Sequence, residues 1–227
     1  MPAGLAQSLS LAIQRRVLGS EAYRQASAVA LYADKDNEVM TDAIMTDAFA
    51  SGRRVLFPKV MAGDAPRRLS LIEVRCSEDL APGAFGVREP SQGRELVPAT
   101  LGRGLMCVPG LGFSPEGARL GRGGGFYDRL IDELSRQDES AFLCAGLAYS
   151  FQMLERLPEG EGDRRLDLVF TESSTFGAPW RRMSVKDDGI KEVSPGGRVD
   201  WNPGPPGRSS GGFASDHGAA AKRRGRT

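Results

Sequence analysis

Three successive local patterns occur within one segment, GLMCVPGLGFSPEGARLGRGGGFYDRLI (residues 104–131). Its first part, GLMCVPG (104–110), is a short continuous apolar run and predicts a buried strand. Glycine then occupies four of the five positions 121–125. Glycine is disfavoured in regular structure by about 0.5–1 kcal/mol, so this run predicts a backbone that turns through positive φ or lies close to a ligand. The apolar residues that follow have helical spacing and predict a helix over 126–136.

The same alternation of strand and helix patterns extends to both sides of this segment. Short apolar runs predict further strands at 28–33, 54–60, 69–74, 142–150 and 166–172. Helical spacing predicts a helix at 42–52 and a short one at 151–157. This alternation predicts an α/β fold with a mainly parallel, Rossmann-like sheet covered by helices on both faces. Ligands of such sheets bind beyond the carboxyl ends of the strands, where the glycine run lies.

The composition changes near the end of the chain. Residues 1–176 carry the α/β pattern and are expected to form one domain. Residues 177–227 are rich in Gly, Pro, Ser and Arg without periodicity, so this tail is expected to be disordered. Its basic end, KRRGR (222–226), could contact RNA, but we expect a solvated segment instead.

Charge and hydropathy exclude several classes of protein. The formal net charge of +1 gives no global attraction to nucleic acid or membrane, so neither partner is expected. No apolar run approaches the roughly 20 residues of a membrane span. The first apolar residues follow no basic region, which argues against a signal peptide. We expect a cytoplasmic monomer, although the Arg and Ser residues near the start leave organellar import open.

Few side chains are available for nucleophilic or metal chemistry. The single histidine, His217, lies in the tail, so neither a Ser-His-Asp triad nor a His-ligated zinc site is expected in the α/β domain. Cys76, Cys107 and Cys144 form no CxxC pair and are expected to be buried, reduced thiols. Any reaction must therefore use carboxylates, arginines, lysines and backbone groups.

The glycine run favours anion binding. It matches neither the Walker A motif nor the GxGxxG fingerprint. A glycine run that opens a helix nevertheless presents N–H groups and the positive end of the helix dipole to phosphate oxygens. Arg119 and Arg122 add charged donors, and Asp128 could hold Mg²⁺ against the phosphates. The alternative is a tight turn in which Asp128 only stabilises the helix N-terminus.

The central motif resembles a known family. VPGLGFSPEGARLGRGGGFYDRLI (108–131) is similar to the signature of the 5-formyltetrahydrofolate cyclo-ligases, also called methenyltetrahydrofolate synthetases. The similarity covers roughly residues 12–173 and continues, in order, through VALYADKDNEVMT, GRRVLFPKV, APGAFGVREP, GLAYSFQ and GDRRLDLVFTE. The resemblance implies an α/β enzyme that uses ATP and Mg²⁺ to convert 5-formyltetrahydrofolate into 5,10-methenyltetrahydrofolate, releasing ADP and phosphate.

The resemblance also implies roles for individual residues. The expected ATP-binding residues are Arg119, Leu120, Gly121, Arg122, Gly123, Gly124, Gly125, Phe126 and Tyr127. The expected folate-binding residues are Glu38, Phe85, Glu89, Arg122, Gly123, Gly124, Gly125, Phe126 and Tyr149. Arg122, Gly124 and Tyr127 are expected to be catalytic, and Asp128 and Asp163 to bind Mg²⁺.

The chain departs from the family pattern at three places. It lacks the N-terminal Lys-x-x-x-Arg type pair that reaches the nucleotide in the family, and Arg15 and Arg16 lie in the following helix. Met40 stands where the family usually has an acid that touches substrate, and Arg88 where a proline is common. These departures leave a second hypothesis, a catalytically weak homologue that binds folate or nucleotide.

Overall fold

The computed structural model describes residues 1–61, 68–95, 102–137 and 142–177. The side chains of Phe85 and Gln137 lie outside this description. The predicted disordered tail also lies outside it, except for Gly177, which belongs to the last strand.

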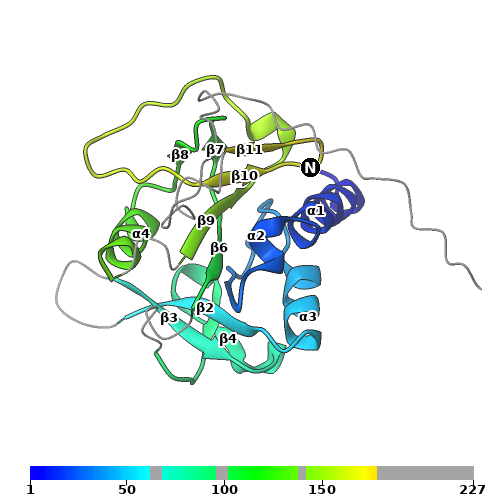
Figure 1. The fold of residues 1–227 in the computed structure, drawn as a ribbon, viewed down its shortest axis with the longest axis vertical. Helices are drawn as coiled ribbons and strands as arrows, with labels where there is room; N and C mark the ends of the chain where they lie inside the picture. The colour runs from blue at the N-terminus through cyan, green and yellow to red at the C-terminus, as the bar shows by residue number, and fades with distance from the viewer. Residues whose placement is uncertain (62–67, 96–101, 138–141, 178–227) are drawn as a thin grey trace, which may run out of the picture.

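The described part of the chain is built around a seven-stranded sheet with the order β11-β10-β9-β6-β1-β2-β3 (Figure 1). Its strands are β1 (Ala28–Ala30), β2 (Arg54–Val60), β3 (Leu69–Val74), β6 (Gly104–Val108), β9 (Phe142–Leu147), β10 (Leu168–Phe170) and β11 (Thr175–Gly177). The five central strands are parallel, whereas β3 and β11 are antiparallel to their neighbours at the two edges. The predicted mainly parallel sheet is therefore confirmed.

The order of the five parallel strands locates the expected ligand position. Taken in chain order they are arranged 5-4-3-1-2, which is the doubly wound order of flavodoxin-like sheets. The connection from β1 to β2 passes through α3 (Asp42–Ala50), and the connection from β6 to β9 passes through α4 (Phe126–Gln137). These helices lie on opposite sides of the sheet (Figure 1). In a sheet with this strand order a ligand is expected beyond the carboxyl ends of β1 and β6.

Helices cover both faces of the sheet, as predicted. On one face α1 (Ala3–Leu18), α2 (Glu21–Arg24) and α3 pack against one set of alternating strand side chains, a core that includes Val29 and Leu105. On the other face α4 packs against the intervening set, which includes Met106. The period of two along each strand thus separates the two hydrophobic cores.

A side chain of α1 caps α3. The Oε1 atom of Gln14 accepts hydrogen bonds from the N–H groups of Ala43 (2.7 Å) and Ile44 (3.3 Å). These are first-turn donors that have no partner within the helix. The hydroxyl of Thr41, the residue before α3, instead donates to Tyr32 O at 3.0 Å. Both contacts fix the start of α3 and the loop before it.

Two small hairpins and several 3₁₀ turns complete the described fold. The hairpin strands are β4 (Leu80–Pro82), β5 (Arg88–Pro90), β7 (Gly112–Phe113) and β8 (Arg119–Leu120). The 3₁₀ turns are η1 (Ser77–Asp79), η2 (Ala84–Gly86) and η4 (Ser150–Gln152). No helix among the described residues has both the length and the apolar character needed to cross a membrane.

The region after β9 differs from the prediction. The expected strand 142–150 ends at Leu147, and the helix expected over 151–157 is wrong, because only η4 forms there. The amide of Gln152 explains the difference, since its Nε2 donates to Gly110 O (3.0 Å) and Leu111 O (3.3 Å). This segment is tied to the β6–β7 connection, where a regular helix would not reach.

Candidate functional site

A cavity of about 800 Å³ opens at the carboxyl ends of β1, β2 and β6. Tyr32 and Ala33 follow β1, Pro58 and Val60 belong to β2, and Pro109 and Gly110 follow β6; all six line it. Small-molecule sites in proteins typically have volumes of about 300–1,000 Å³. The cavity thus has the size of a ligand site and lies where the strand order places one.

Most of the site residues named from the sequence meet in this cavity. The lining includes Arg119, Leu120, Gly121, Arg122, Gly123, Gly124, Gly125, Phe126, Tyr127 and Asp128. It also includes Glu38, Glu89 and Asp163, which come from three other segments of the chain. Tyr149 does not line it, because its side chain is fully buried behind the wall. The side chain of Phe85 lies outside the described residues, although its neighbours Ala84 and Val87 line the cavity.

The glycine loop, residues 121–125, has the backbone geometry that its composition predicts. Gly123 and Gly125 have φ values of 91° and 59°, in the left-handed region that favours glycine. At Gly124 a Cβ atom would lie 2.7 Å from the ring of Phe126, so a side chain cannot be accommodated without displacing that ring. Since α4 begins at Phe126, the N-terminal N–H groups of this helix lie at the end of the loop.

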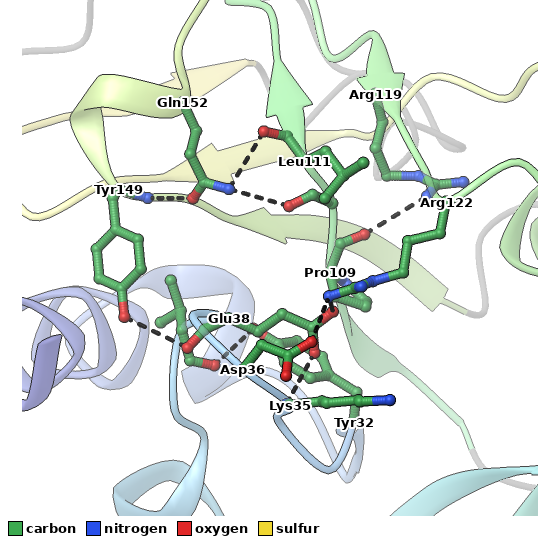
Figure 2. Close-up of polar contacts among 12 residues, drawn as sticks. Tyr32, Lys35, Asp36, Glu38, Pro109, Leu111, Arg119, Arg122, Tyr149 and Gln152 are labelled. Atoms are coloured by element: carbon green, nitrogen blue, oxygen red, sulfur yellow. Dashed lines mark hydrogen bonds and ion pairs between the residues drawn. The ribbon is translucent and has the colours of Figure 1, made fainter. Parts of the chain in front are cut away.

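An ion pair between Arg119 in β8 and Asp128 in α4 connects the elements on either side of the glycine loop. Arg119 Nη2 lies 3.0 and 2.9 Å from the two oxygens of Asp128, and the side chains are only 5% and 17% exposed. Arg119 Nη1 also donates to Pro109 O at 3.5 Å (Figure 2), and the guanidinium lies 5.6 Å from the Tyr127 ring centre. Its buried Nε has no hydrogen-bond partner among the described residues. An unused donor therefore remains in the wall of the cavity.

A weaker pair of contacts connects the glycine loop with the loop that follows β1. Arg122 Nη2 lies 3.5 Å from Asp36 Oδ2 and 3.4 Å from Glu38 Oε1 (Figure 2). The Arg122 side chain is 55% exposed, so this contact is screened by solvent. The Arg122 guanidinium is therefore only weakly held by these two carboxylates.

Burial governs the ionisation of Glu38 and Tyr127. Burial raises the pKa of Glu38, while the backbone N–H of Lys35 (3.0 Å) and the charge of Arg122 act in the opposite direction. Burial also raises the pKa of Tyr127, and the negative charge of Glu38 adds to this effect. The Tyr127 hydroxyl therefore stays protonated at neutral pH and can act as a hydrogen-bond donor.

Two carboxylates in the cavity are suited to a magnesium ion bound to phosphates. The described residues contain no group of three His, Cys, Asp or Glu that could enclose a metal. Asp128 and Asp163 nevertheless both line the cavity, and the N–H of Arg164 donates to Asp128 Oδ1 at 3.4 Å. Mg²⁺ is usually held by one or two carboxylates together with water and substrate phosphates. The donor set fits that mode of binding.

Three lining residues with polar side chains are missing from the sequence-based site prediction. Tyr32, Lys35 and Arg88 all face the cavity, and all lie within the family-like segments 29–41 and 81–90. The similarity of these segments to the family could have indicated that the cavity lies nearby. It does not tell which of their residues line the cavity.

The first basic residues of the chain lie away from the cavity. Neither Arg15 nor Arg16 lines it, and Arg16 Nη2 donates to Glu172 O at 3.3 Å. Of the cysteines, Cys107 and Cys144 are buried as expected, whereas Cys76 is exposed. That part of the thiol prediction is wrong, because Cys76 follows β3 and lies at the start of the surface turn η1.

The chain is similar to 5-formyltetrahydrofolate cyclo-ligases from several organisms. A family model described as the 5-formyltetrahydrofolate cyclo-ligase family matches residues 4–172. The 5-formyltetrahydrofolate cyclo-ligase of Mus musculus is 28% identical over 170 residues, covering 73% of this chain and 83% of the relative. The enzyme of the same name from Escherichia coli K12 is 29% identical over 152 residues, covering 66% and 81%.

Solved structures agree with the sequence relatives. The Aquifex aeolicus 5,10-methenyltetrahydrofolate synthetase has a TM-score of 0.67 and 28% identity, with coverage of 85% of this chain and 89% of that one. A Mycoplasma pneumoniae 5,10-methenyltetrahydrofolate synthetase shares the fold, with a TM-score of 0.56 and 24% identity. The family match, the relatives and the cavity formed around the glycine loop lead to one conclusion: the chain belongs to the 5-formyltetrahydrofolate cyclo-ligase family.

Proposed function

We propose that this protein converts 5-formyltetrahydrofolate into 5,10-methenyltetrahydrofolate in a reaction that uses ATP and Mg²⁺ and releases ADP and phosphate. One observation carries the assignment of the site: a single cavity gathers the whole glycine loop, two candidate metal carboxylates and two further acids from distant segments. Family membership supports the choice of reaction.

The reaction needs activation of a poor electrophile. The formyl carbon is attached to a nitrogen that donates electrons into the carbonyl, so direct attack by the second folate nitrogen is slow. ATP supplies a γ-phosphoryl group that converts the formyl oxygen into a leaving group. The second nitrogen then bonds to the formyl carbon and loses its proton, the carbon–oxygen bond breaks, and the oxygen leaves within inorganic phosphate. Such chemistry depends on positioning and charge stabilisation and does not require a protein nucleophile.

The glycine loop and its arginines are proposed to bind the phosphates. The absence of side chains at Gly123 and Gly124 allows phosphate oxygens to approach the backbone N–H groups at the start of α4. Arg122 is exposed and weakly paired, so it can turn from Asp36 and Glu38 toward the transferring group. The protonated hydroxyl of Tyr127 can stabilise charge that develops on the formyl oxygen.

Asp128 and Asp163 are proposed to hold Mg²⁺ against the phosphate oxygens. Arg119 already contacts Asp128, which fixes the carboxylate at the cavity wall and compensates its charge before any ion arrives. Asp163 is fixed in a similar way, because its Oδ2 accepts a hydrogen bond from Gly160 N at 2.8 Å. Both carboxylates are therefore positioned by the fold in advance of binding.

The folate is proposed to contact two further acids that line the cavity, Glu38 and Glu89. Carboxylates of Glu38 and Glu89 are suited to the amino-pyrimidinone edge of a pterin, since they accept hydrogen bonds from its N–H groups. The resemblance adds the ring of Phe85, next to the lining residue Ala84, as a stacking surface. The folate and the phosphates would then meet at the glycine loop.

We further propose that the protein acts as a monomer in the cytoplasm. The thiol of Cys107 is fully buried and burial raises its pKa to about 12, which is consistent with a reduced structural cysteine. A homologue from Arabidopsis thaliana carries the designation mitochondrial, so an organellar location is the alternative. Size-exclusion chromatography and a fluorescent fusion test these two points.

The test of the reaction is direct. Purified protein is mixed with 5-formyltetrahydrofolate, and methenyltetrahydrofolate is followed by its near-ultraviolet absorbance with ATP, without ATP, and with a non-hydrolysable analogue. Product is expected only with ATP and Mg²⁺. Absence of product from folded protein would reject the reaction, and tight folate binding without turnover would instead support the weakly active homologue.

A further inference from the structure

A buried chain of hydrogen bonds holds the loop that carries Glu38 into the cavity. Tyr149 Oη donates to the carbonyl oxygen of Glu38 at 3.3 Å (Figure 2). The same hydroxyl lies 2.8 Å from Ser10 Oγ, and Ser10 Oγ accepts from the N–H of Met40 at 3.1 Å. Because the Tyr149 proton points to Glu38, Ser10 must donate to Tyr149. The chain therefore runs from Met40 through Ser10 and Tyr149 to Glu38, and each hydroxyl both donates and accepts.

A third side chain holds the residue in between. Tyr32 Oη donates to the carbonyl oxygen of Val39 at 2.7 Å. The backbones of Glu38, Val39 and Met40 are thus bound by Tyr149, Tyr32 and Ser10. Tyr149 follows β9, Tyr32 follows β1, and Ser10 belongs to α1. The three side chains are 0–3% exposed, so water does not compete for these contacts.

These contacts orient the backbone of Glu38, and the N–H of Lys35, which donates to Glu38 Oε2 at 3.0 Å, orients its carboxylate further. Its carbonyl oxygen is bound on the buried side, while its carboxylate reaches the cavity, where it is 16% exposed and lies 3.4 Å from Arg122. Met40 has no polar side-chain group that could hold the loop, so the backbone contacts do so.

We propose that Tyr149 is a positioning residue for the folate side of the site. It acts with Ser10, from behind the cavity wall, to set the Glu38 carboxylate where it meets the substrate. This inference rests on the proposed function. The sequence predicted that Tyr149 contacts the folate directly, whereas here it acts on the folate only through Glu38. It also gives α1 a part in substrate recognition, although the cavity-lining residues described above include none from that helix.

The variant Tyr149→Phe tests the role of the hydroxyl alone. The ring is retained, including its stacking on Phe151 at 5.4 Å between ring centres. Loss of the hydroxyl, which donates to Glu38 O and accepts from Ser10, is expected to raise KM for 5-formyltetrahydrofolate about five- to tenfold, with KM for ATP changed less than about twofold. The matched control is Tyr23→Phe, which removes a buried hydroxyl that donates to Asp47 at 2.6 Å away from the cavity and should leave both KM values unchanged.

A double-mutant cycle separates positioning from general weakening of the fold. In a Glu38→Gln background, Tyr149→Phe is expected to raise KM for the folate less than about twofold, because the two residues act as one unit. A wild-type KM in Tyr149→Phe, or the same KM increase in both backgrounds, would overturn the inference. If Tyr149→Phe fails to fold, Ser10→Ala interrupts the same chain at its other end and carries the same expectations.

The wild-type protein in the same assay distinguishes the two levels of the argument. If it forms product and Tyr149→Phe behaves like it, the positioning role alone is rejected. If it binds 5-formyltetrahydrofolate without forming product, the proposed reaction is rejected. The dissociation constant for the folate then replaces KM in the comparison of wild type, Tyr149→Phe and the double mutant, and the same results support or overturn the positioning role. If it neither binds nor converts the folate, both are rejected.

Discussion

Arg119 in β8 and Asp128 in α4 form an ion pair that connects the elements on either side of the glycine loop, with Nη2 2.9 Å from the nearer carboxylate oxygen. The residues are nine positions apart in sequence, yet their side chains meet in the wall of the cavity. The contact makes Asp128 a structural anchor of the loop as well as a candidate ligand of Mg²⁺. The two roles can be separated by measurement.

Replacement of Asp128 by Asn should affect both roles. Loss of the metal-binding charge is expected to reduce kcat more than about a hundredfold. Arg119 would also lose its buried anion, which is expected to lower the free energy of unfolding by about 1–3 kcal/mol. ATP-dependent turnover and urea unfolding measure the two effects.

The control for Asp128 is Asp132→Asn, one turn further along α4. Asp132 binds the exposed side chain of Arg164 through two nitrogens, with Nε at 3.0 Å. The pair is exposed to solvent, and Asp132 does not line the cavity, so a change in kcat of less than about threefold is expected. Equal loss of activity in both variants would contradict the role given to Asp128.

Single alanines in the glycine loop should weaken nucleotide binding. Gly123→Ala forces a Cβ atom into a left-handed conformation, at a cost of about 1–2 kcal/mol, and Gly124→Ala displaces the Phe126 ring. Both are expected to raise KM for ATP. Gly162→Ala is the control, because its Cβ meets nothing within 4 Å and its φ is not positive. An unchanged KM for ATP in both loop variants would argue against phosphate binding there.

Glu38 is expected to lower stability at neutral pH. Its pKa is raised by burial above the ordinary value of 4.5, so the folded state binds its proton more tightly than the unfolded chain does. The free energy of unfolding therefore falls as the pH rises from the pKa of Glu38 in the unfolded chain through its higher pKa in the folded state. Glu38→Gln should unfold at higher urea concentration than wild type at pH 7, and this difference should disappear below about pH 4.

Glu73→Gln provides a control of opposite sign. The ion pair with Arg54, at 2.7 Å, holds the pKa of Glu73 below its ordinary value. The stabilisation by this ion pair is present at pH values above the ordinary pKa of Glu73. It is lost as the pH falls through the lower pKa that Glu73 has in the folded state. Glu73→Gln should therefore be less stable than wild type at pH 7. A Glu38→Gln variant that is also less stable would contradict the burial argument.

The three cysteines should differ in reactivity. Cys76 is exposed, whereas Cys107 and Cys144 are buried. Burial raises the pKa of Cys107 to about 12, so almost no reactive thiolate exists at pH 8. An aromatic disulfide reagent is expected to modify one thiol per native chain and three in denaturant. Rapid modification of more than one native thiol would indicate that the core opens.

Continuous local patterns were the predictable part of the fold. The strands β2 and β3 lie at the predicted bounds, and α4 is only one residue longer than expected, because each is a run whose own apolar pattern matches its burial. The helix expected over 151–157 failed for the opposite reason. The contacts of Gln152 with Gly110 and Leu111 join residues about forty positions apart, and no local pattern contains them.

In the candidate site, too, contiguous motifs were predictable from the sequence, whereas contacts between distant segments were not. Positions 119–128 were identified together because they form one contiguous motif, and all of them line the cavity. The strand order that places β6 beside β1 depends on pairing between distant segments, so the switch point was not readable from the sequence. Tyr149 lies behind the wall because its hydroxyl meets Ser10, 139 positions away. Motif similarity indicated its neighbourhood but not its orientation.

Transfer of the formyl oxygen provides the most direct test of the proposal that ATP and the folate meet at the glycine loop. 5-Formyltetrahydrofolate labelled with oxygen-18 in its formyl group is converted by the protein with unlabelled ATP in ordinary water. The inorganic phosphate is then analysed by mass spectrometry. One oxygen-18 atom per phosphate is expected for each molecule of methenyltetrahydrofolate formed. Unlabelled phosphate accompanying product would show that the two ligands do not react with each other in this cavity.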